Sequence, residues 1–292
     1  VSSPSGDTTA HYSVREGRPT DGSPDRLPVA SPDRLYLVAA SSLPHFRPVY
    51  DALVSMGFYN LNPDAMKELQ GSDAGELLHR DGSNIASVVD RLSNDKPEVF
   101  RRIKEYLERI VPGVKEFKRV PLGPRETLEF RQEIRGSKNP WTFHAASMSD
   151  GTLRALGALT AVTQLANRRM PVTLVGIEEP ETALHPAAAG ILVDALREAA
   201  SQTQIVVTTH SPDLLDLIDP EKKESLLVVE SRGGTTLVAA PDTASREAIK
   251  NHLYSAGELL RMEQLQPDEA HIKQQEAAQL SFGFADAEES EH

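Results

Sequence analysis

Apolar residues recur every three or four positions between residues 60 and 111, which is the spacing of amphipathic helices. The series from Ile85 to Leu92 is one example, and "PEVFRRIKEYLERIV" continues it, so this segment is predicted to be a helical block. "FRPVYDALVSMG" predicts an earlier helix closed by Gly57. Asn62 and Pro63 stand in the order of a helix cap and a first helical residue.

After residue 111 the period shortens to two. "GVKEFKRVPLG" and "ETLEFRQEI" alternate apolar and polar positions, as antiparallel strands do. "PWTFHAASMSDG" is predicted to be a strand or edge segment that runs into a turn. It contains Trp141, the one tryptophan of the chain, for which packing in the core is the simplest role.

From Gly151 onward, helical stretches alternate with short apolar runs. "TLRALGALTAVTQLAN" and "AAAGILVDALREAAS" predict helices. "PVTLVGI" and "QIVVTT" are almost entirely apolar, which predicts strands buried on both faces of a mainly parallel sheet. A hairpin turning at Gly233–Gly234 follows, and then a last helix from Ser245 to about Met262.

These patterns divide the chain into four segments. Prolines, serines and glycines predict a largely irregular N-terminal segment over residues 1–34, with one short strand at "AHYSVRE". Residues 35–146 are expected to hold the helical block and antiparallel strands of a first lobe. Residues 147–262 form a second lobe of alternating helices and strands. Residues 263–292 have one lysine against eight acids, which predicts an acidic flexible tail.

Composition narrows the class of protein. The 292 residues include no cysteine, which excludes disulfides and thiolate metal sites. No apolar run approaches the roughly 20 residues that a membrane span requires. The N-terminal "VSSPSGDTTA" lacks the basic start and apolar core of a signal peptide. We therefore expect a soluble, cytoplasmic protein with no membrane partner.

The charge is unevenly distributed. The net charge of −12 argues against indiscriminate adhesion to nucleic acid. Phe100 to Lys138, in contrast, holds eleven Lys and Arg against six Glu, and solvated helix faces are the simplest explanation. If this basic stretch contacts DNA, binding should weaken steeply with salt. The candidate residues for that contact are Arg101, Arg102, Lys104, Lys115, Lys118 and Arg119.

An apolar strand ends abruptly in two acids in "VTLVGIEEPE". Ligands of open α/β sheets bind beyond the carboxyl ends of the strands, where Glu178 and Glu179 are expected. One carboxylate there can hold Mg²⁺, and its neighbour can orient an attacking water. An isolated pair of glutamates is otherwise explained as the solvent-exposed end of a strand.

Two further segments offer groups that suit a phosphate. "QIVVTTHSPDLL" places His210 just after a strand, where an imidazole can donate to a phosphate oxygen, although an ordinary loop histidine is the alternative. "SMSDGTLRAL" places Ser149, Asp150, Gly151 and Thr152 at a helix start. Backbone N–H groups and the helix dipole favour anions there, although an ordinary helix cap has the same sequence.

The order of these motifs resembles that of the C-terminal lobe of ABC-type ATPases, and more specifically the SMC/RecF-like branch, which acts in genome maintenance and phage defence. "MSDGT" aligns with the signature motif, "VTLVGIEEP" with the Walker B strand, "ETALHP" with the D-loop and "TTHSP" with the switch histidine. The resemblance covers residues 147–217 and extends to about residues 45–262. It implies an α/β P-loop NTPase fold with a mainly parallel sheet flanked by helices, plus a helical insertion and antiparallel strands.

The resemblance also assigns roles at the nucleotide. Ser149, Asp150, Gly151 and Thr152 would bind the γ-phosphate of ATP held by a partner subunit, so a homodimer enclosing the nucleotide is expected. Glu178 would serve the Mg²⁺ site.

Two catalytic roles follow from the same alignment. Glu179 would position or activate the attacking water, and His210 would sense the γ-phosphate. The chain departs from the common pattern at two positions. Glu178 stands where many ABC proteins have aspartate, and His185 stands where the D-loop often has aspartate, which puts communication between subunits there in doubt.

One expected part is not found in the sequence. No glycine-rich run ends in Lys–Ser or Lys–Thr, as the phosphate-binding loop (Walker A) does, and "ESRGGTTL" lacks the lysine. The simplest interpretation is a truncated gene product or fragment, and the alternative is a degenerate subunit that completes a partner's site. Because that loop supplies most of the contacts to the β- and γ-phosphates, the chain alone should bind ATP weakly and hydrolyse it negligibly.

Two other functions compete with an ATPase. A non-catalytic interaction module would use the same surfaces only to dock a partner protein or DNA. A nuclease of the overcoming-lysogenization-defect type would need a Toprim domain. The segment "LLVVESRGGTTLV", which contains Glu230, resembles the opening strand of such a domain. No "DxD" follows that strand, and only about 60 residues remain, so the nuclease is disfavoured.

Overall fold

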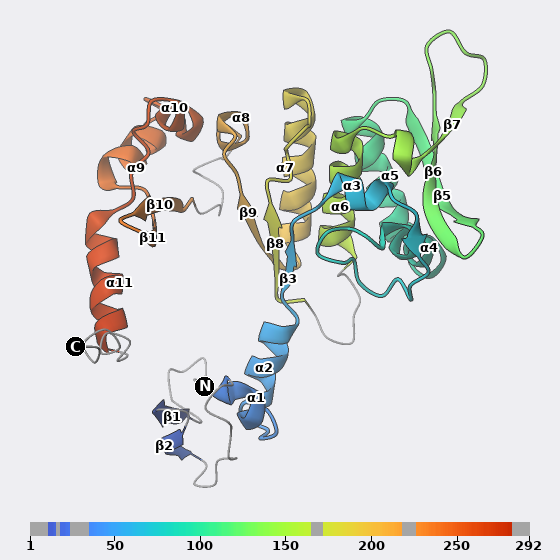
Figure 1. Ribbon diagram of the computed structural model, residues 1–292. Helices are drawn as coiled ribbons and strands as arrows, with labels where there is room; N and C mark the ends of the chain where they lie inside the picture. The colour runs from blue at the N-terminus through green and yellow to red at the C-terminus, as the bar shows by residue number, and fades with distance from the viewer. Residues whose placement is uncertain (1–10, 16–17, 24–34, 165–171, 218–225, 282–292) are drawn as a thin grey trace. The chain divides into compact units, whose positions relative to one another are not determined.

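The computed structural model describes residues 11–15, 18–23, 35–164, 172–217 and 226–281 (Figure 1). The chain divides into two compact units. The first unit comprises residues 1–183 and 194–208, and the second unit comprises residues 184–193 and 209–292. Among the helices of the described residues, none is both long and apolar enough to cross a bilayer.

The first unit begins with a small aromatic cluster. Its elements are β1 (His11–Arg15), β2 (Arg18–Ser23), α1 (Tyr36–Ala40) and α2 (Arg47–Val54). The strand expected at "AHYSVRE" is therefore present, paired antiparallel with β2. The ring of Tyr12 packs edge-to-face against Tyr36 and Phe46, with centroids 5.0 and 5.1 Å away. This packing gives the short N-terminal elements a local core of their own.

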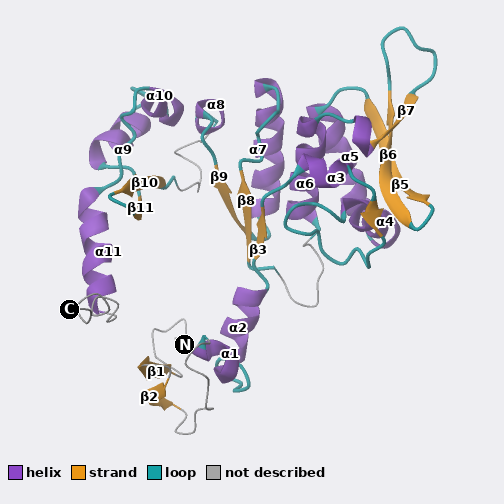
Figure 2. Ribbon diagram, viewed as in Figure 1, coloured by secondary structure: helices purple, strands orange, loops and turns teal. Residues whose placement is uncertain are grey.

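A parallel three-stranded sheet forms the centre of the first unit. Its strands are β3 (Gly57–Tyr59), β8 (Leu174–Glu178) and β9 (Gln204–Thr208), in the order β3-β8-β9 (Figure 2). Val175 and Ile177 of β8 are buried, as their apolar run predicts. Gly57 does not close α2, which ends at Val54; it begins β3 instead. Glu178 pairs with Thr208, so β8 and β9 end together.

β9 is less buried than its sequence predicts. Val206 exposes 42% of its surface, and Ile205 and Val207 are only half-buried. In the part of the chain that the structure describes, β9 pairs with β8 alone. The prediction of a strand buried on both faces is therefore wrong for β9, because an apolar sequence does not reveal whether a strand is central or at an edge.

Beside this sheet, the helical block and the antiparallel strands form as predicted. The elements are α3 (Pro63–Lys67), β4 (Gln70–Gly71), α4 (Ile85–Asp95), α5 (Pro97–Ile110), β5 (Val114–Leu122), β6 (Arg125–Gln132) and β7 (Trp141–His144). β6 pairs with β4, β5 and β7, all antiparallel. The Asn62 side chain accepts the N–H of Asp64 at 3.0 Å, which confirms the predicted cap of α3.

Trp141 does not pack in the core. It is 56% exposed on β7, and its ring stacks on Phe143 with centroids 6.3 Å apart. Its indole N–H donates to Ser137 Oγ at 3.1 Å. The tryptophan therefore closes the loop between β6 and β7 rather than filling the interior.

Helix α6 (Asp150–Thr163) lies in the hydrophobic core of this region. Leu153, Leu156 and Leu159 are fully buried, and the helix packs against α3, α5 and β8. A Cβ placed on Gly157 would lie 2.9 Å from Leu61 Cδ1, so any larger residue here would require the buried Leu61 side chain to shift. The predicted helix of "TLRALGALTAVTQLAN" is confirmed through Thr163; its last residues lie outside the described ranges.

The second unit contains a hairpin and several short helices. Its elements are α8 (Pro212–Leu215), β10 (Val228–Arg232), β11 (Thr235–Ala239), α9 (Thr243–Lys250), α10 (Ala256–Arg261) and α11 (Glu269–Ser281). α7 (Pro186–Ala200) belongs to both units. Gly233 and Gly234 have φ of +59° and +86°, which confirms the predicted turn.

Two predictions about the C-terminal part are wrong. The single helix expected from residue 245 to 262 is broken into α9 and α10, because His252 adopts φ +54° and Ser255 starts α10 with a capping box. Part of the expected flexible tail is helical. α11 packs Ile272 against Leu237 and Ala239 of the hairpin, an apolar contact that the acidic composition concealed. Residues 282–292 of that tail lie outside the described residues.

Candidate functional site

The turn before α6 has the geometry of a capped helix start. A 3₁₀ turn over Ala145–Ser147 leads into it. Ser149 Oγ accepts the N–H of Thr152 at 3.2 Å and lies 2.7 Å from the Thr152 hydroxyl. Ser149 and Asp150 are exposed, while Gly151 and Thr152 are buried. The ordinary cap is thus present, and it fixes the turn whose N–H groups were predicted to face a phosphate.

An ion pair that the sequence did not indicate lies at this turn. Lys67 Nζ, at the end of α3, contacts Asp150 Oδ1. The lysine side chain is 27% exposed and the aspartate side chain is 53% exposed. The hydrogen bond to Asp150 raises the pKa of Lys67. Because 83 residues separate the partners, no local pattern could have linked them.

The acid pair lies at the carboxyl end of the parallel sheet, as predicted from the strand pattern. Glu178 is the exposed last residue of β8. Glu179 follows with φ +40°, a conformation that costs energy for a residue other than glycine. Its N–H donates to the Thr208 carbonyl at 3.0 Å, and its Oε2 accepts the Thr182 hydroxyl at 3.1 Å. Backbone and side chain of Glu179 are therefore both held in place.

The acids suit a metal that arrives with its own ligands. Among the described residues, no group of three or more His, Asp or Glu side chains gathers around one point. Mg²⁺ in nucleotide sites takes one or two protein carboxylates and completes its shell with phosphate oxygens and water. An exposed Glu178 at a strand end fits that role, whereas a cage made only of protein ligands does not fit these residues.

His185 and His210 belong to the second unit, whereas the turn at Ser149 and the acid pair belong to the first unit. His185 Nδ1 accepts the N–H of Ala187 at 3.2 Å, at the start of α7. His210 is exposed and lies two residues after β9. Ser211 Oγ then accepts the N–H of Leu214 at 3.3 Å and caps α8. The structure brings the acid pair and the end of β9 together at one sheet edge.

The basic stretch is largely offset by carboxylates. Five of the six candidate DNA-contact residues form ion pairs: Arg101 with Glu98 and Glu105, Arg102 with Glu105 and Glu198, Lys115 with Glu108 and Glu133, Lys118 with Glu129, and Arg119 with Glu126 and Asp90. Lys104 lies 5.9 Å from the Phe100 ring centroid. These charges support the folded structure, and they give little support to a DNA surface along this stretch. Glu230, the glutamate of the nuclease alternative, pairs with Arg232.

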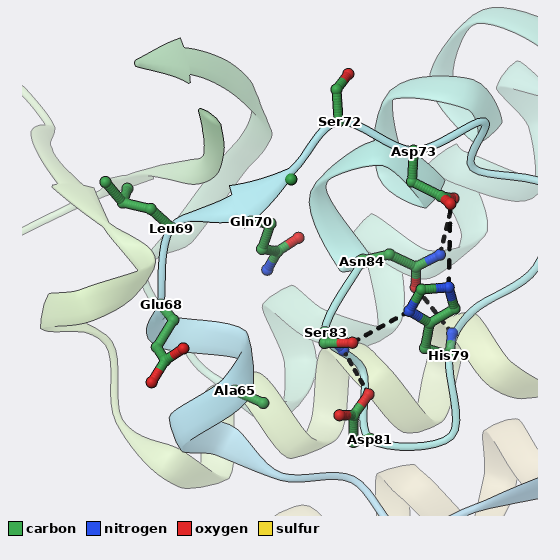
Figure 3. Close-up of a pocket in the computed structure, with 11 residues that line it drawn as sticks. Ala65, Glu68, Leu69, Gln70, Ser72, Asp73, His79, Asp81, Ser83 and Asn84 are labelled. Carbon is green, nitrogen blue, oxygen red and sulfur yellow. Dashed lines mark hydrogen bonds and ion pairs between the residues drawn. The ribbon is translucent and has the colours of Figure 1, made fainter. Parts of the chain in front are cut away.

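A cleft of about 460 Å³ lies beside α3, β4 and the start of α4 (Figure 3). The His79 ring lies between Asp73 and Ser83, with Nδ1 3.1 Å from Ser83 Oγ. The N–H of Gly75 and the amide of Asn84 lower the pKa of Asp73. The polar groups of this cleft form hydrogen bonds mainly with one another. Their simplest role is therefore to hold the loop of residues 72–84 in its conformation.

The sequence profile of one protein family matches residues 20–216, about two thirds of the chain. Its description reads "AAA domain, putative AbiEii toxin, Type IV TA system". The chain belongs to this family. Membership confirms that the chain is an AAA-type ATPase-family protein, and with the parallel sheet flanked by helices it confirms the α/β P-loop NTPase fold class. Among curated proteins, no sequence matches this chain.

Solved structures with a similar fold include SMC head domains. One comes from work on "ATP-driven dimerization and DNA stimulated activation of SMC ATPases", with TM-score 0.40 and 17% identity over 56% of this chain and 96% of that chain. A Pyrococcus furiosus Smc head bound to the C-terminal domain of ScpA has TM-score 0.41 and 14% identity over 56% of this chain and 40% of that chain. An SmcHead bound to the C-winged helix domain of ScpA has TM-score 0.43 and 14% identity over 65% of this chain and 56% of that chain. The family assignment rests on the profile match and not on these low scores.

Proposed function

We propose that this member of the AAA domain family is an ATP-binding and ATP-hydrolysing SMC/RecF-like subunit that works as a nucleotide-sandwich dimer. In this arrangement Ser149–Thr152 of one subunit faces the γ-phosphate of Mg·ATP held by the other. The dimer would serve DNA repair, genome maintenance or phage defence. The single observation that carries the proposal is Glu179, an acid held at φ +40° at the carboxyl end of the sheet.

The strain at Glu179 supports a functional role. An acid that merely ends a strand in solvent has no need of a left-handed backbone, which costs about 1–3 kcal/mol. Here the backbone bond to Thr208 holds the Glu179 main chain, and the hydroxyl of Thr182 holds its carboxylate. A fixed carboxylate can accept a proton from water as the water attacks phosphorus.

The proposed reaction uses the other site residues as supports. Water oxygen bonds to the γ-phosphorus, the bond to the β–γ bridging oxygen breaks, and ADP leaves with the electron pair. Glu179 takes the proton of the attacking water. Glu178 would hold the Mg²⁺, which would supply positive charge at the phosphates, and His210 would donate to a γ-phosphate oxygen.

The test uses a family member that carries a phosphate loop together with the acid pair. Changing the glutamate that corresponds to Glu179 to glutamine should lower ATP hydrolysis about 10²–10⁴-fold, because glutamine cannot accept the proton. Sedimentation velocity should then show ATP-bound dimers accumulating. The matched control changes to glutamine the residue that corresponds to Glu133, an exposed acid beside the antiparallel strands. This variant should hydrolyse ATP at the normal rate.

Two results would contradict the proposal. Unchanged hydrolysis and dimerisation in the Glu179-position variant would favour the non-catalytic interaction module instead. A calorimetric titration giving low-micromolar ATP affinity for this isolated chain would contradict the expectation that it binds ATP weakly.

A further inference from the structure

The turn that faces the phosphate in the proposed function carries an unfavourable charge. Asp150 is the first residue of α6, between Ser149 and Gly151. Its carboxylate stabilises the helix through the dipole. The same carboxylate repels a triphosphate that approaches the same N–H groups. A site for ATP at this turn therefore needs a cation that compensates Asp150.

Lys67 is placed to supply that cation. Its Nζ contacts Asp150 Oδ1 and lies 4.0 Å from Asp64 Oδ1. The helix that carries Lys67 is fixed at its start, which Asn62 caps, and along its inner face, where Met66 is fully buried. α3 also packs directly against α6 and the preceding 3₁₀ turn. The lysine is thus held by the fold, unlike a lysine on a loop.

We propose that Lys67 is a positioning residue of the phosphate-facing turn. It holds the Asp150 side chain and neutralises it, so that the N–H group of Gly151 can receive a phosphate. The N–H of Thr152 already donates to Ser149 Oγ, so the Thr152 amide serves only to report on the turn. The inference rests on the proposed function and names a residue of the same site that the family motifs do not include. Lys67 acts through Asp150 and does not itself contact the nucleotide.

The test follows the Gly151 and Thr152 amides by NMR while the ¹⁵N-labelled chain is titrated with Mg·ATP, and separately with inorganic triphosphate. The wild-type chain is expected to bind weakly, so the titration extends to high ligand concentration, where both amides should show saturable shifts. Lys67→Ala should weaken binding about 3- to 10-fold, the size of one uncompensated charge near the surface. Lys67→Arg should bind within about 2-fold of wild type, since it keeps the charge.

A double variant separates positioning from direct contact. Lys67→Ala/Asp150→Asn removes both the compensating cation and the charge it compensates, so binding should return to within about 2-fold of wild type. Lys138→Ala, a change at an exposed loop lysine, is the control and should bind normally. Thermal midpoints of all variants show that the folded state is retained.

Each other outcome overturns a defined statement. If Lys67→Ala binds as tightly as wild type while wild type shifts Gly151 and Thr152, the inference fails and the proposed function stands. If the double variant stays as weak as Lys67→Ala, the lysine contacts phosphate directly and the positioning role is refuted. If wild type shows no shift at either amide with either probe, the phosphate-facing role of the turn fails, and the inference fails with it.

Discussion

Two ion pairs in the first unit use similar groups and differ in burial. Lys67 pairs with Asp150, whose side chain is 53% exposed. Arg119 pairs with Glu126 at 2.6 Å, and that glutamate is 1% exposed. Ser87 also donates to Glu126. A buried carboxylate must keep its partners because water cannot replace them, whereas an exposed carboxylate can exchange its partner at little cost. Burial therefore predicts that the Arg119–Glu126 pair contributes more to folding than the Lys67–Asp150 pair does.

The largest effect is expected at the buried pair. Arg119→Met should lower the free energy of unfolding by about 3–5 kcal/mol, because Glu126 loses its charge partner without regaining water. Urea denaturation monitored by circular dichroism measures the loss. The double variant Arg119→Met/Glu126→Gln should recover much of it, since no buried charge is then left unpaired. A loss below about 1 kcal/mol for the single variant would show that Glu126 finds other compensation.

An intermediate effect is expected at Glu198 on α7. Its carboxylate accepts Arg102 Nε at 2.9 Å and the Tyr106 hydroxyl at 2.6 Å, which joins α7 to α5. The hydrogen bond from Arg102, followed by that from Tyr106, lowers the pKa of Glu198. Because the folded-state pKa is below the unfolded one, this glutamate stabilises the protein above its unfolded pKa, and the stabilisation is lost as the pH falls through the folded pKa.

Glu198→Gln should therefore cost about 0.5 kcal/mol at pH 7, a value reduced for solvent screening. Between about pH 5 and pH 3 the wild type should lose stability faster than the variant, until the two meet. Thermal unfolding at several pH values measures this difference. Parallel pH profiles for the two proteins would show that the α5–α7 contact does not depend on the charge of Glu198.

The smallest effect on stability is expected at the exposed pair. Lys67→Ala should leave the thermal midpoint of the chain unchanged within error, because exposed pairs contribute little to folding. Differential scanning calorimetry measures this midpoint. A clear fall would place Lys67 with Arg119 as a structural residue and would remove the difference between the two pairs.

The sequence predicts those features that depend on local spacing. The helical period from Ile85 to Leu92 and the alternation in β5 and β6 were sufficient to place α4 and the antiparallel sheet. The apolar run that ends at Glu178 was sufficient to place the acid pair at a strand end. Each of these features depends on neighbours within a few residues, where propensity and pattern agree.

Features that depend on distant partners were missed. Trp141 is apolar and aromatic, but it lies on a strand that, within the described ranges, pairs with β6 alone, and this leaves it exposed. Nothing near Val206 in the sequence indicates that β9 has one strand neighbour in the described residues. Lys67 reaches Asp150 only because α3 packs on α6. The burial of a residue and the long-range partner of a charge are set by tertiary contacts that no local pattern encodes.

The left-handed backbone at Glu179 bears on any attempt to improve this protein by directed evolution. Glycine adopts φ +40° without strain, so a library screened only for survival after heating should enrich Glu179→Gly. Such a variant would have lost the carboxylate and gained an unstrained backbone at this turn. Under the proposed function, rounds of selection at this position should therefore alternate a heat challenge with an assay of ATP hydrolysis, because a heat-stable Glu179→Gly variant would lack the proposed base.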